Sequence, residues 1–333
     1  MNSKERIYAL LNGQAIDRIP VTPILMAFAA RFIRKTYCEY YLNYQVLVDS
    51  YLACQKEFNF DMVMAISDPF RETEGYGAVF SYPDNGIPVM KEPLLKTLED
   101  REINSLPVLD PHQASRMKDR LLAVNAFHQI ISKDIPILGW VEGPFAEAAD
   151  LRGVQNLMMD IIDQPEQVES LLKIVLETEK KFAEEQIKAG ADIIGVGDAA
   201  ASLLSPSLYK KYVLPFEQEL FNSIHQLGAK VKLHICGNTS GLLPYMAQTG
   251  ADIIDLDFMV SLKEARHYFG SQVCICGNVD PISVMLEGTP EDVRQASLRC
   301  IEDAGMPFIL SAGCEIPVAT PPENLHALCQ AVL

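Results

Sequence analysis

The chain has 333 residues, with 28 Lys and Arg against 44 Asp and Glu, for a formal net charge of −16. Hydrophobic residues make up 49% and charged residues 22%, a globular composition that excludes general disorder. The acidity argues against nucleic-acid binding, which rests on clustered Lys and Arg. The charged, amphipathic first segment and the lack of an apolar run of about 20 residues predict a cytoplasmic protein without a membrane span.

Eight short apolar runs bounded by turn residues predict β-strands. The runs are almost continuously apolar, as is typical of parallel strands that are covered on both faces. We expect these strands at 19–25, 61–67, 135–141, 192–197, 230–236, 252–257, 272–278 and 307–312.

Helical patterns separate these strands. Residues 164–190 carry apolar side chains at helical spacing and end at Gly190, a residue typical of helix C-termini. Residues 206–227 predict two helices divided near Pro215. Residues 290–304 open with Pro-Glu-Asp, which favours a first helical turn.

The alternation of eight strands with helices predicts an α/β fold, a (β/α)8 TIM barrel formed by residues 1–333 as one domain. The long connection from 68 to 135 predicts an insertion between strands 2 and 3, with a hairpin turn at Asp84-Asn85-Gly86. A doubly wound open sheet is the alternative. It is weaker because no Gly-rich phosphate loop is present.

In TIM barrels the active site lies at the carboxyl ends of the strands, where this sequence has His234 and Cys236. Residues i and i+2 of a strand share a face, so this pair presents an imidazole and a thiol together. Cys314 follows the eighth strand and completes a His and two Cys set, which is typical of zinc. Cys276 competes as the third ligand, and chance placement of these residues is the structural alternative.

Carboxylates also follow these strands, but each has a structural alternative. Asp68 and Asp198 could cap the helices that follow them. Glu142 and Asp257 could ligate the metal or orient a ligating histidine. Asn278 could serve only to shape the turn before Pro281.

At these residues the chain resembles the uroporphyrinogen decarboxylase superfamily, whose fold is a (β/α)8 barrel. The likeness runs over nearly the whole chain, including RIYALLNGQAIDRIPVTP, GWVEGPF, GADIIGVGDAA, GNVDP and ILSAGC. The decarboxylase motif after the first strand reads MAFAARF here, so one of its two arginines is lost and Arg31 is kept. Asp150 replaces the active-site Tyr, and Cys314 replaces the His of the last motif.

The resemblance implies the zinc-dependent branch of this superfamily, similar to methylcobamide:coenzyme M methyltransferases. It implies His234, Cys236 and Cys314 as zinc ligands and Asp68 as a pocket residue. The expected reaction moves a methyl group between a small thiol, ether, alcohol or amine and a corrinoid held by a partner protein. The alternatives are cofactor-free tetrapyrrole decarboxylation and a catalytically silent binding protein. The full set expected to act in catalysis is Asp68, Glu142 and Asp198, and the set expected to bind substrate is Met26, Arg31, Asp257 and Asn278.

Overall fold

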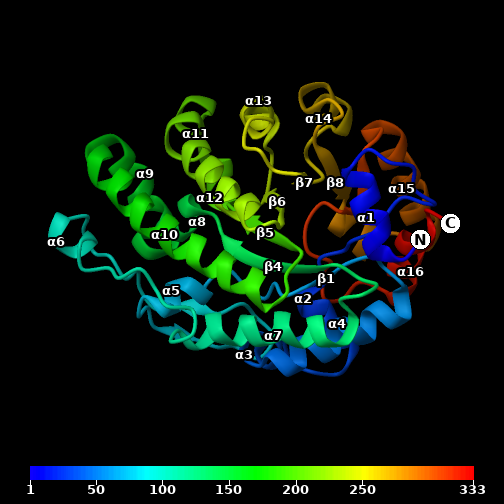
Figure 1. Ribbon diagram of the computed structural model, residues 1–333, viewed down its shortest axis with the longest axis horizontal. Coiled ribbons are helices and arrows are strands. Elements are labelled where there is room, and N and C mark those ends of the chain that lie inside the picture. The colour runs from blue at the N-terminus through cyan, green and yellow to red at the C-terminus, as the bar shows by residue number, and fades with distance from the viewer.

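A curled sheet of seven parallel strands forms the centre of the structure, a computed structural model that describes residues 1–333 (Figure 1). The strand order is β1-β4-β5-β6-β7-β8-β9, so each strand from β4 onward pairs with its neighbour in the chain. The strands are β1 (Val63–Met64), β4 (Ile137–Glu142), β5 (Ile193–Gly197), β6 (Lys230–Ile235), β7 (Ile253–Leu256), β8 (Cys274–Val279) and β9 (Phe308–Ala312).

The first predicted strand, 19–25, forms only one parallel bridge, between Val21 and Leu310 of β9. The Thr22 N–H donates to the Leu310 carbonyl at 3.0 Å, and the Asp61 N–H donates to the Val21 carbonyl at 2.7 Å. This segment therefore lies between β9 and the residues that lead into β1. Pro20 and Pro23 flank the bridge and lack the N–H groups that a longer ladder needs.

Helices surround the sheet (Figure 1). The α-helices are α1 (Ser3–Leu11), α2 (Met26–Phe32), α3 (Tyr37–Leu42), α4 (Tyr44–Phe58), α5 (Arg71–Gly75), α6 (Asp100–Ile103), α7 (Ser115–Ile131), α8 (Pro144–Arg152), α9 (Val154–Asp163), α10 (Pro165–Ala189), α11 (Pro206–Tyr212), α12 (Leu214–Gln226), α13 (Leu243–Met246), α14 (Leu262–Phe269), α15 (Pro290–Ala304) and α16 (Pro322–Gln330). Three short helical segments complete the set: η1 (Ala199–Leu203), η2 (Ser240–Leu242) and η3 (Pro281–Leu286). None of the helices is both long and apolar enough to cross a membrane.

The three helical regions predicted from the sequence are confirmed. The α10 helix starts at Pro165 and ends before Gly190, whose φ of +114° suits a left-handed cap. The predicted division near Pro215 separates α11 from α12 at Val213. Thr289 caps α15 through a reciprocal capping box with Asp292.

The segment between β1 and β4 contains the predicted hairpin and three helices. Strands β2 (Phe80–Ser81) and β3 (Val89–Met90) pair antiparallel, with Phe80 opposite Met90. The helices α5 and α7 of this segment carry two buried arginines, Arg71 and Arg116. Both arginines donate hydrogen bonds to carboxyl groups that line the cavity described below.

The strand register aligns one row of residues across the sheet. Glu142 pairs with Gly197, Gly197 pairs with His234, and His234 pairs with Asp255. Paired residues on parallel strands point to the same face. Because Glu142 ends β4 and Gly197 ends β5, the row lies at the carboxyl ends of these strands, where Glu142, Gly197 and His234 line a cavity.

Candidate metal centre

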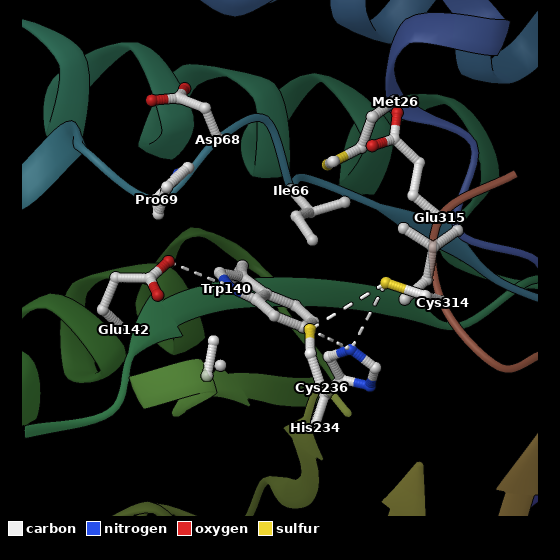
Figure 2. Close-up of a pocket in the computed structure, with 13 residues that line it drawn as sticks. Met26, Ile66, Asp68, Pro69, Trp140, Glu142, His234, Cys236, Cys314 and Glu315 are labelled. Atoms are coloured by element: carbon white, nitrogen blue, oxygen red, sulfur yellow. Dashed lines mark hydrogen bonds between the residues drawn. The ribbon is translucent and has the colours of Figure 1, made fainter. Parts of the chain in front are cut away.

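A cavity of about 200 Å³ opens at the carboxyl ends of the strands (Figure 2). Its wall combines apolar side chains with two thiols, an imidazole and three carboxyl groups. The lining residues are Ile24, Met26, Ile66, Asp68, Pro69, Trp140, Glu142, Gly197, Ala199, His234, Cys236, Cys314 and Glu315.

Three of the lining residues converge in one corner of the cavity. His234 Nε2 lies 3.1 Å from Cys236 Sγ and 3.8 Å from Cys314 Sγ, and the two sulfurs are 3.9 Å apart. His234 lies on β6, Cys236 is the first residue after β6, and Cys314 follows β9. Gly237, with φ of +83°, turns the chain immediately after Cys236.

These three donor atoms fit a zinc ion. Each residue offers one ligand atom, and the three atoms all lie within 4.8 Å of one another. A tetrahedral zinc site has edges of about 3.8 Å between sulfurs and about 3.5 Å between nitrogen and sulfur, from bond lengths of about 2.3 and 2.0 Å. The distances between the side chains are close to these values. One tetrahedral position would then face the cavity.

Asp255 stands behind the histidine. Its Oδ2 lies 3.5 Å from His234 Nδ1 and 2.8 Å from Lys232 Nζ, and all three side chains are buried. Although burial opposes ionisation, Lys232 and His234 lower the pKa of Asp255 to about 2. A carboxylate facing Nδ1 leaves Nε2 to face the two sulfurs, which is the usual arrangement behind a metal-bound histidine.

The two thiols differ in acidity. Hydrogen bonds from Cys236 and His234 lower the pKa of Cys314 to about 4, although burial acts in the opposite direction. The same hydrogen bond to Cys314 raises the pKa of Cys236. Cys314 is therefore a thiolate at neutral pH, and a soft cation is its natural partner.

Asp68 enters the cavity from the opposite wall and is held by Arg116. The Nη1 of Arg116 donates to Asp68 Oδ1 at 3.1 Å, and its Nη2 donates to Oδ2. Burial favours the protonated acid, but Arg116 and the nearby Arg71 lower the pKa of Asp68 overall. Asp68 therefore stays a carboxylate of fixed orientation.

Glu142 lies beside the ring of Trp140. Its Oε1 accepts hydrogen bonds from Arg71 Nη2 at 2.8 Å and from Trp140 Nε1 at 3.2 Å. Burial raises the pKa of Glu142 well above its ordinary value in spite of Arg71. Gly195 on β5 makes room for the indole, since a Cβ there would lie 2.3 Å from Trp140 Cε3.

The structure brings six of the expected site residues to the cavity: Met26, Asp68, Glu142, His234, Cys236 and Cys314. Four others lie outside it. Arg31 donates to the Val318 carbonyl, at a separate surface hollow. Asp198 accepts from the Ala146 N–H at 2.8 Å, Asp257 accepts from the N–H groups of Gly237 and Met259, and Asn278 donates to the carbonyls of Asp257 and Val260.

Sequence reasoning missed two residues of this site and left one without a role. Trp140 stands two residues before Glu142 on the same strand, so strand periodicity already placed both on one face. Asp255 stands two residues before Asp257, but only the pairing register shows that Asp255 faces His234. Glu315 follows Cys314, and burial raises its pKa to about 7 while its Oε1 accepts from the Ala27 N–H.

The chain belongs to the uroporphyrinogen decarboxylase (URO-D) family, whose model matches residues 2–333. It is 29% identical to the methylcobamide:CoM methyltransferase MtbA of Methanosarcina mazei, over 98% of this chain and 96% of that protein. It is 27% identical to the uroporphyrinogen decarboxylase of Trichodesmium erythraeum, over 94% of this chain and 91% of that protein.

A solved structure described as a methyltransferase from Methanosarcina mazei matches with a TM-score of 0.91 at 25% identity. The match covers 99% of this chain and 98% of that one. With the curled parallel sheet, this likeness establishes a TIM-barrel-like α/β fold.

Proposed function

We propose that this protein is a zinc-dependent methyltransferase that moves a methyl group between a small substrate and a corrinoid carried by a partner protein. The observation that carries the proposal is the convergence of His234, Cys236 and Cys314 in the wall of the cavity. The likeness to methylcobamide:CoM methyltransferases supports both the chemistry and the corrinoid partner.

In this proposal His234, Cys236 and Cys314 hold the zinc ion, and Asp255 keeps the imidazole in place. When bound, zinc holds a thiol substrate as its thiolate or polarises the oxygen or nitrogen of a methyl donor. Asp68 and Glu142 orient the rest of the substrate from fixed positions. Trp140 and the apolar wall exclude water from the cavity.

For a thiol substrate the reaction balances as RSH + CH3–Co(III) giving RSCH3 + Co(I) + H⁺. The S–C bond forms, and the Co–C bond breaks with its electron pair remaining on cobalt. The thiol proton leaves to solvent. For a methyl donor the same exchange runs in reverse, with cobalt(I) attacking the methyl group.

Tetrapyrrole decarboxylation is disfavoured by the size and charge of the cavity. At about 200 Å³ the cavity is smaller than the roughly 300–1,000 Å³ of sites for drug-sized ligands. No arginine or lysine lines it to bind the carboxylates of a tetrapyrrole. Asp198, Asp257, Asn278 and Arg31 act as structural residues in this proposal.

We further propose that the segment around Val21 serves as the eighth strand of a barrel, which its single bridge to Leu310 supports. In this proposal residues 1–333 form one domain, and the segment between β1 and β4 is an insertion. A reducing, cytoplasmic location suits the metal centre. In an oxidising compartment Cys236 and Cys314, 3.9 Å apart, would be free to form a disulfide.

The test is methyl transfer between free methylcobalamin and small thiols, followed by the absorbance of cob(I)alamin under anaerobic conditions. Zinc-loaded protein is expected to transfer the methyl group, and Cys236→Ser is expected to lose both zinc and transfer. Cys300→Ser, which changes a cysteine outside the cavity on α15, serves as the matched control. Full transfer by Cys236→Ser, or none by a zinc-loaded wild type across thiols and methyl donors, would contradict the proposal.

A further inference from the structure

Apolar side chains line the cavity next to the metal centre. They belong to Ile24, Met26, Ile66, Pro69, Trp140 and Ala199. In Figure 2, Ile66 and Trp140 lie between the metal centre and the carboxyl groups of Asp68 and Glu142. A group attached to a reacting atom at the metal centre therefore meets Ile66 and Trp140 first.

The cavity offers no cation to an anionic substrate. No lysine or arginine lines it. Arg116 and Arg71 are almost completely buried, and their guanidinium groups are bonded to Asp68 and Glu142. An anion that leaves water for this cavity would lose its hydration without gaining a charged partner, which opposes its binding.

The cavity also offers little to a cationic substrate, because its carboxyl groups are already engaged. Both oxygens of Asp68 accept two hydrogen bonds each, from Arg116, from the Phe70 N–H at 3.1 Å and from Ser67 Oγ at 2.9 Å. Glu142 accepts from Arg71 and from the indole of Trp140. These bonds offset the charge of the two groups and fix their orientation.

The third carboxyl group, that of Glu315, accepts from the Ala27 N–H at 3.0 Å. It supplies no cation in either of its charge states, so an anion is disfavoured whether or not Glu315 is ionised. Burial of hydrocarbon against the apolar side chains is the contribution to binding that the wall offers in both cases.

We infer that the part of the substrate that does not react is uncharged and apolar, a short alkyl or aryl group. This group packs against Ile66 and Trp140, and the reacting atom faces the metal centre. The inference rests on the proposed function for the position of the reacting atom. The choice of an apolar group rests on the lining side chains and their hydrogen bonds.

Three thiols with the same two-carbon chain and a tetrahedral end group of similar shape test this choice. They are 3,3-dimethylbutanethiol, which is neutral and apolar, (2-mercaptoethyl)trimethylammonium, which is cationic, and 2-mercaptoethanesulfonate (coenzyme M), which is anionic. The first two differ only by carbon in place of the charged nitrogen.

Binding to the Co²⁺-substituted protein is read from the thiolate-to-cobalt absorption, without any methyl transfer. The same thiols titrated onto a small Co²⁺ chelate with one open position give their intrinsic affinities, by which the protein affinities are divided. After this correction the apolar thiol is expected to bind at least about tenfold more tightly than the sulfonate. It is also expected to bind more tightly than the ammonium thiol.

Ala199→Arg tests whether the missing cation causes the preference. Ala199 lines the cavity but is exposed, so a longer side chain can extend there without entering the core. The added guanidinium is expected to lower the ratio between apolar and sulfonate affinities several-fold. Ala319→Arg adds the same charge at an exposed position outside the cavity and is expected to leave the ratio unchanged. If Ala199→Arg does not fold, the order of the three thiols on the wild type still decides.

The outcomes separate this inference from the proposed function. Equal or tighter binding of either charged thiol, or an unchanged ratio in folded Ala199→Arg, overturns the apolar preference. Binding in the expected order without methyl transfer to or from cobalamin supports the apolar preference and contradicts the proposed function. Methyl transfer that favours the sulfonate does the reverse. Absence of any spectral change with all three thiols contradicts both.

Discussion

Cys314 and Cys276 both lie on the last two strands or just beyond them, yet only Cys314 is placed to bind zinc. Cys314 Sγ lies 3.8 Å from His234 Nε2, whereas the fully buried Cys276 contacts Thr22 Oγ1 at 3.7 Å and does not line the cavity. Cys314→Ala is expected to weaken zinc binding by more than about 100-fold, since a lost ligand exceeds the effect of a lost outer partner.

Zinc affinity measured by competition with a chromophoric chelator checks this expectation. Cys276→Ala is the comparison, because it removes the competing thiol, which pairs with Asp255 across β7 and β8 but is not one of the three converging residues. Loss of zinc from Cys276→Ala but not from Cys314→Ala would show that Cys276, and not Cys314, is the third zinc ligand.

Asp255 faces His234 at 3.5 Å and is expected to influence zinc binding through it. Asp255→Asn removes the carboxylate that holds the imidazole and is expected to weaken zinc binding by about 10–100-fold. The same chelator competition measures the loss. Asp252→Asn is the control, since Asp252 precedes the other end of β7 and pairs with Lys230 and His225 rather than with His234. An affinity in Asp255→Asn equal to that of the wild type would show that the carboxylate has no such role.

At the scale of the element, strand β5 makes room for Trp140 at its two glycines, Gly195 and Gly197. A Cβ at Gly195 would lie 2.3 Å from Trp140 Cε3 and 2.9 Å from Leu138 Cδ2. Gly195→Ala is therefore expected to displace the indole and to lower the free energy of unfolding by about 1–3 kcal/mol. Denaturant unfolding followed by the fluorescence of Trp140, the one tryptophan of the chain, measures both effects.

Gly241→Ala gives the comparison for this substitution. A Cβ at Gly241 would meet only Pro206 Cγ at 3.6 Å, an ordinary contact, so stability and emission should remain near those of the wild type. Equal effects of the two substitutions would mean that the room beside Trp140 is not specific to Gly195.

The elements show how far the sequence predicts this molecule. Seven of the expected strands pair in the sheet, because continuous apolar runs bounded by turn residues mark buried parallel strands well. The expected strand at 19–25 is reduced to a single bridge at Val21, because the prolines at 20 and 23 lack the N–H groups of a longer ladder. The pairing of His234 with Cys236 was predictable because i and i+2 on one strand share a face, and Cys314 was suggested by its place after the last strand. The His234–Asp255 pairing depends on a register between strands that the sequence does not display.

Charged groups from distant segments were the least predictable part of the site. Arg71 and Arg116 lie on helices between β1 and β4, and only the folded chain shows that they bond to Asp68 and Glu142. The family resemblance suggested that Arg31 binds substrate, but in the structure its side chain, on α2, donates a hydrogen bond to the Val318 carbonyl. Such placements depend on how helices pack around the sheet, which short motifs do not encode.

At the scale of the whole molecule, buried acids make stability depend on pH. Glu217 on α12 is fully buried, and burial raises its pKa well above the ordinary value, although Tyr209 donates to it. The native state then keeps a proton that the unfolded chain releases above about pH 4.5. Stability therefore falls as the pH rises from that value toward the folded-state pKa.

Glu217→Gln stays neutral at every pH, so its advantage over the wild type should grow with pH. We expect this advantage to widen steadily from pH 5 to pH 8, since each pH unit between the unfolded and folded pKa values is worth up to about 1.4 kcal/mol. Thermal or urea unfolding across this range measures it. Glu219→Gln, on the exposed side of the same helix, should follow the wild type. A constant difference between Glu217→Gln and the wild type at all pH values would refute this account of Glu217.

The central claim for the molecule is that its cavity holds zinc on His234, Cys236 and Cys314. The most direct measurement is elemental analysis of the purified protein after dialysis into metal-free buffer without chelators, beside His234→Ala prepared in the same way. The account predicts about one zinc per wild-type chain and very little in the variant. Less than about 0.2 zinc per wild-type chain, or the same content in both proteins, would contradict it.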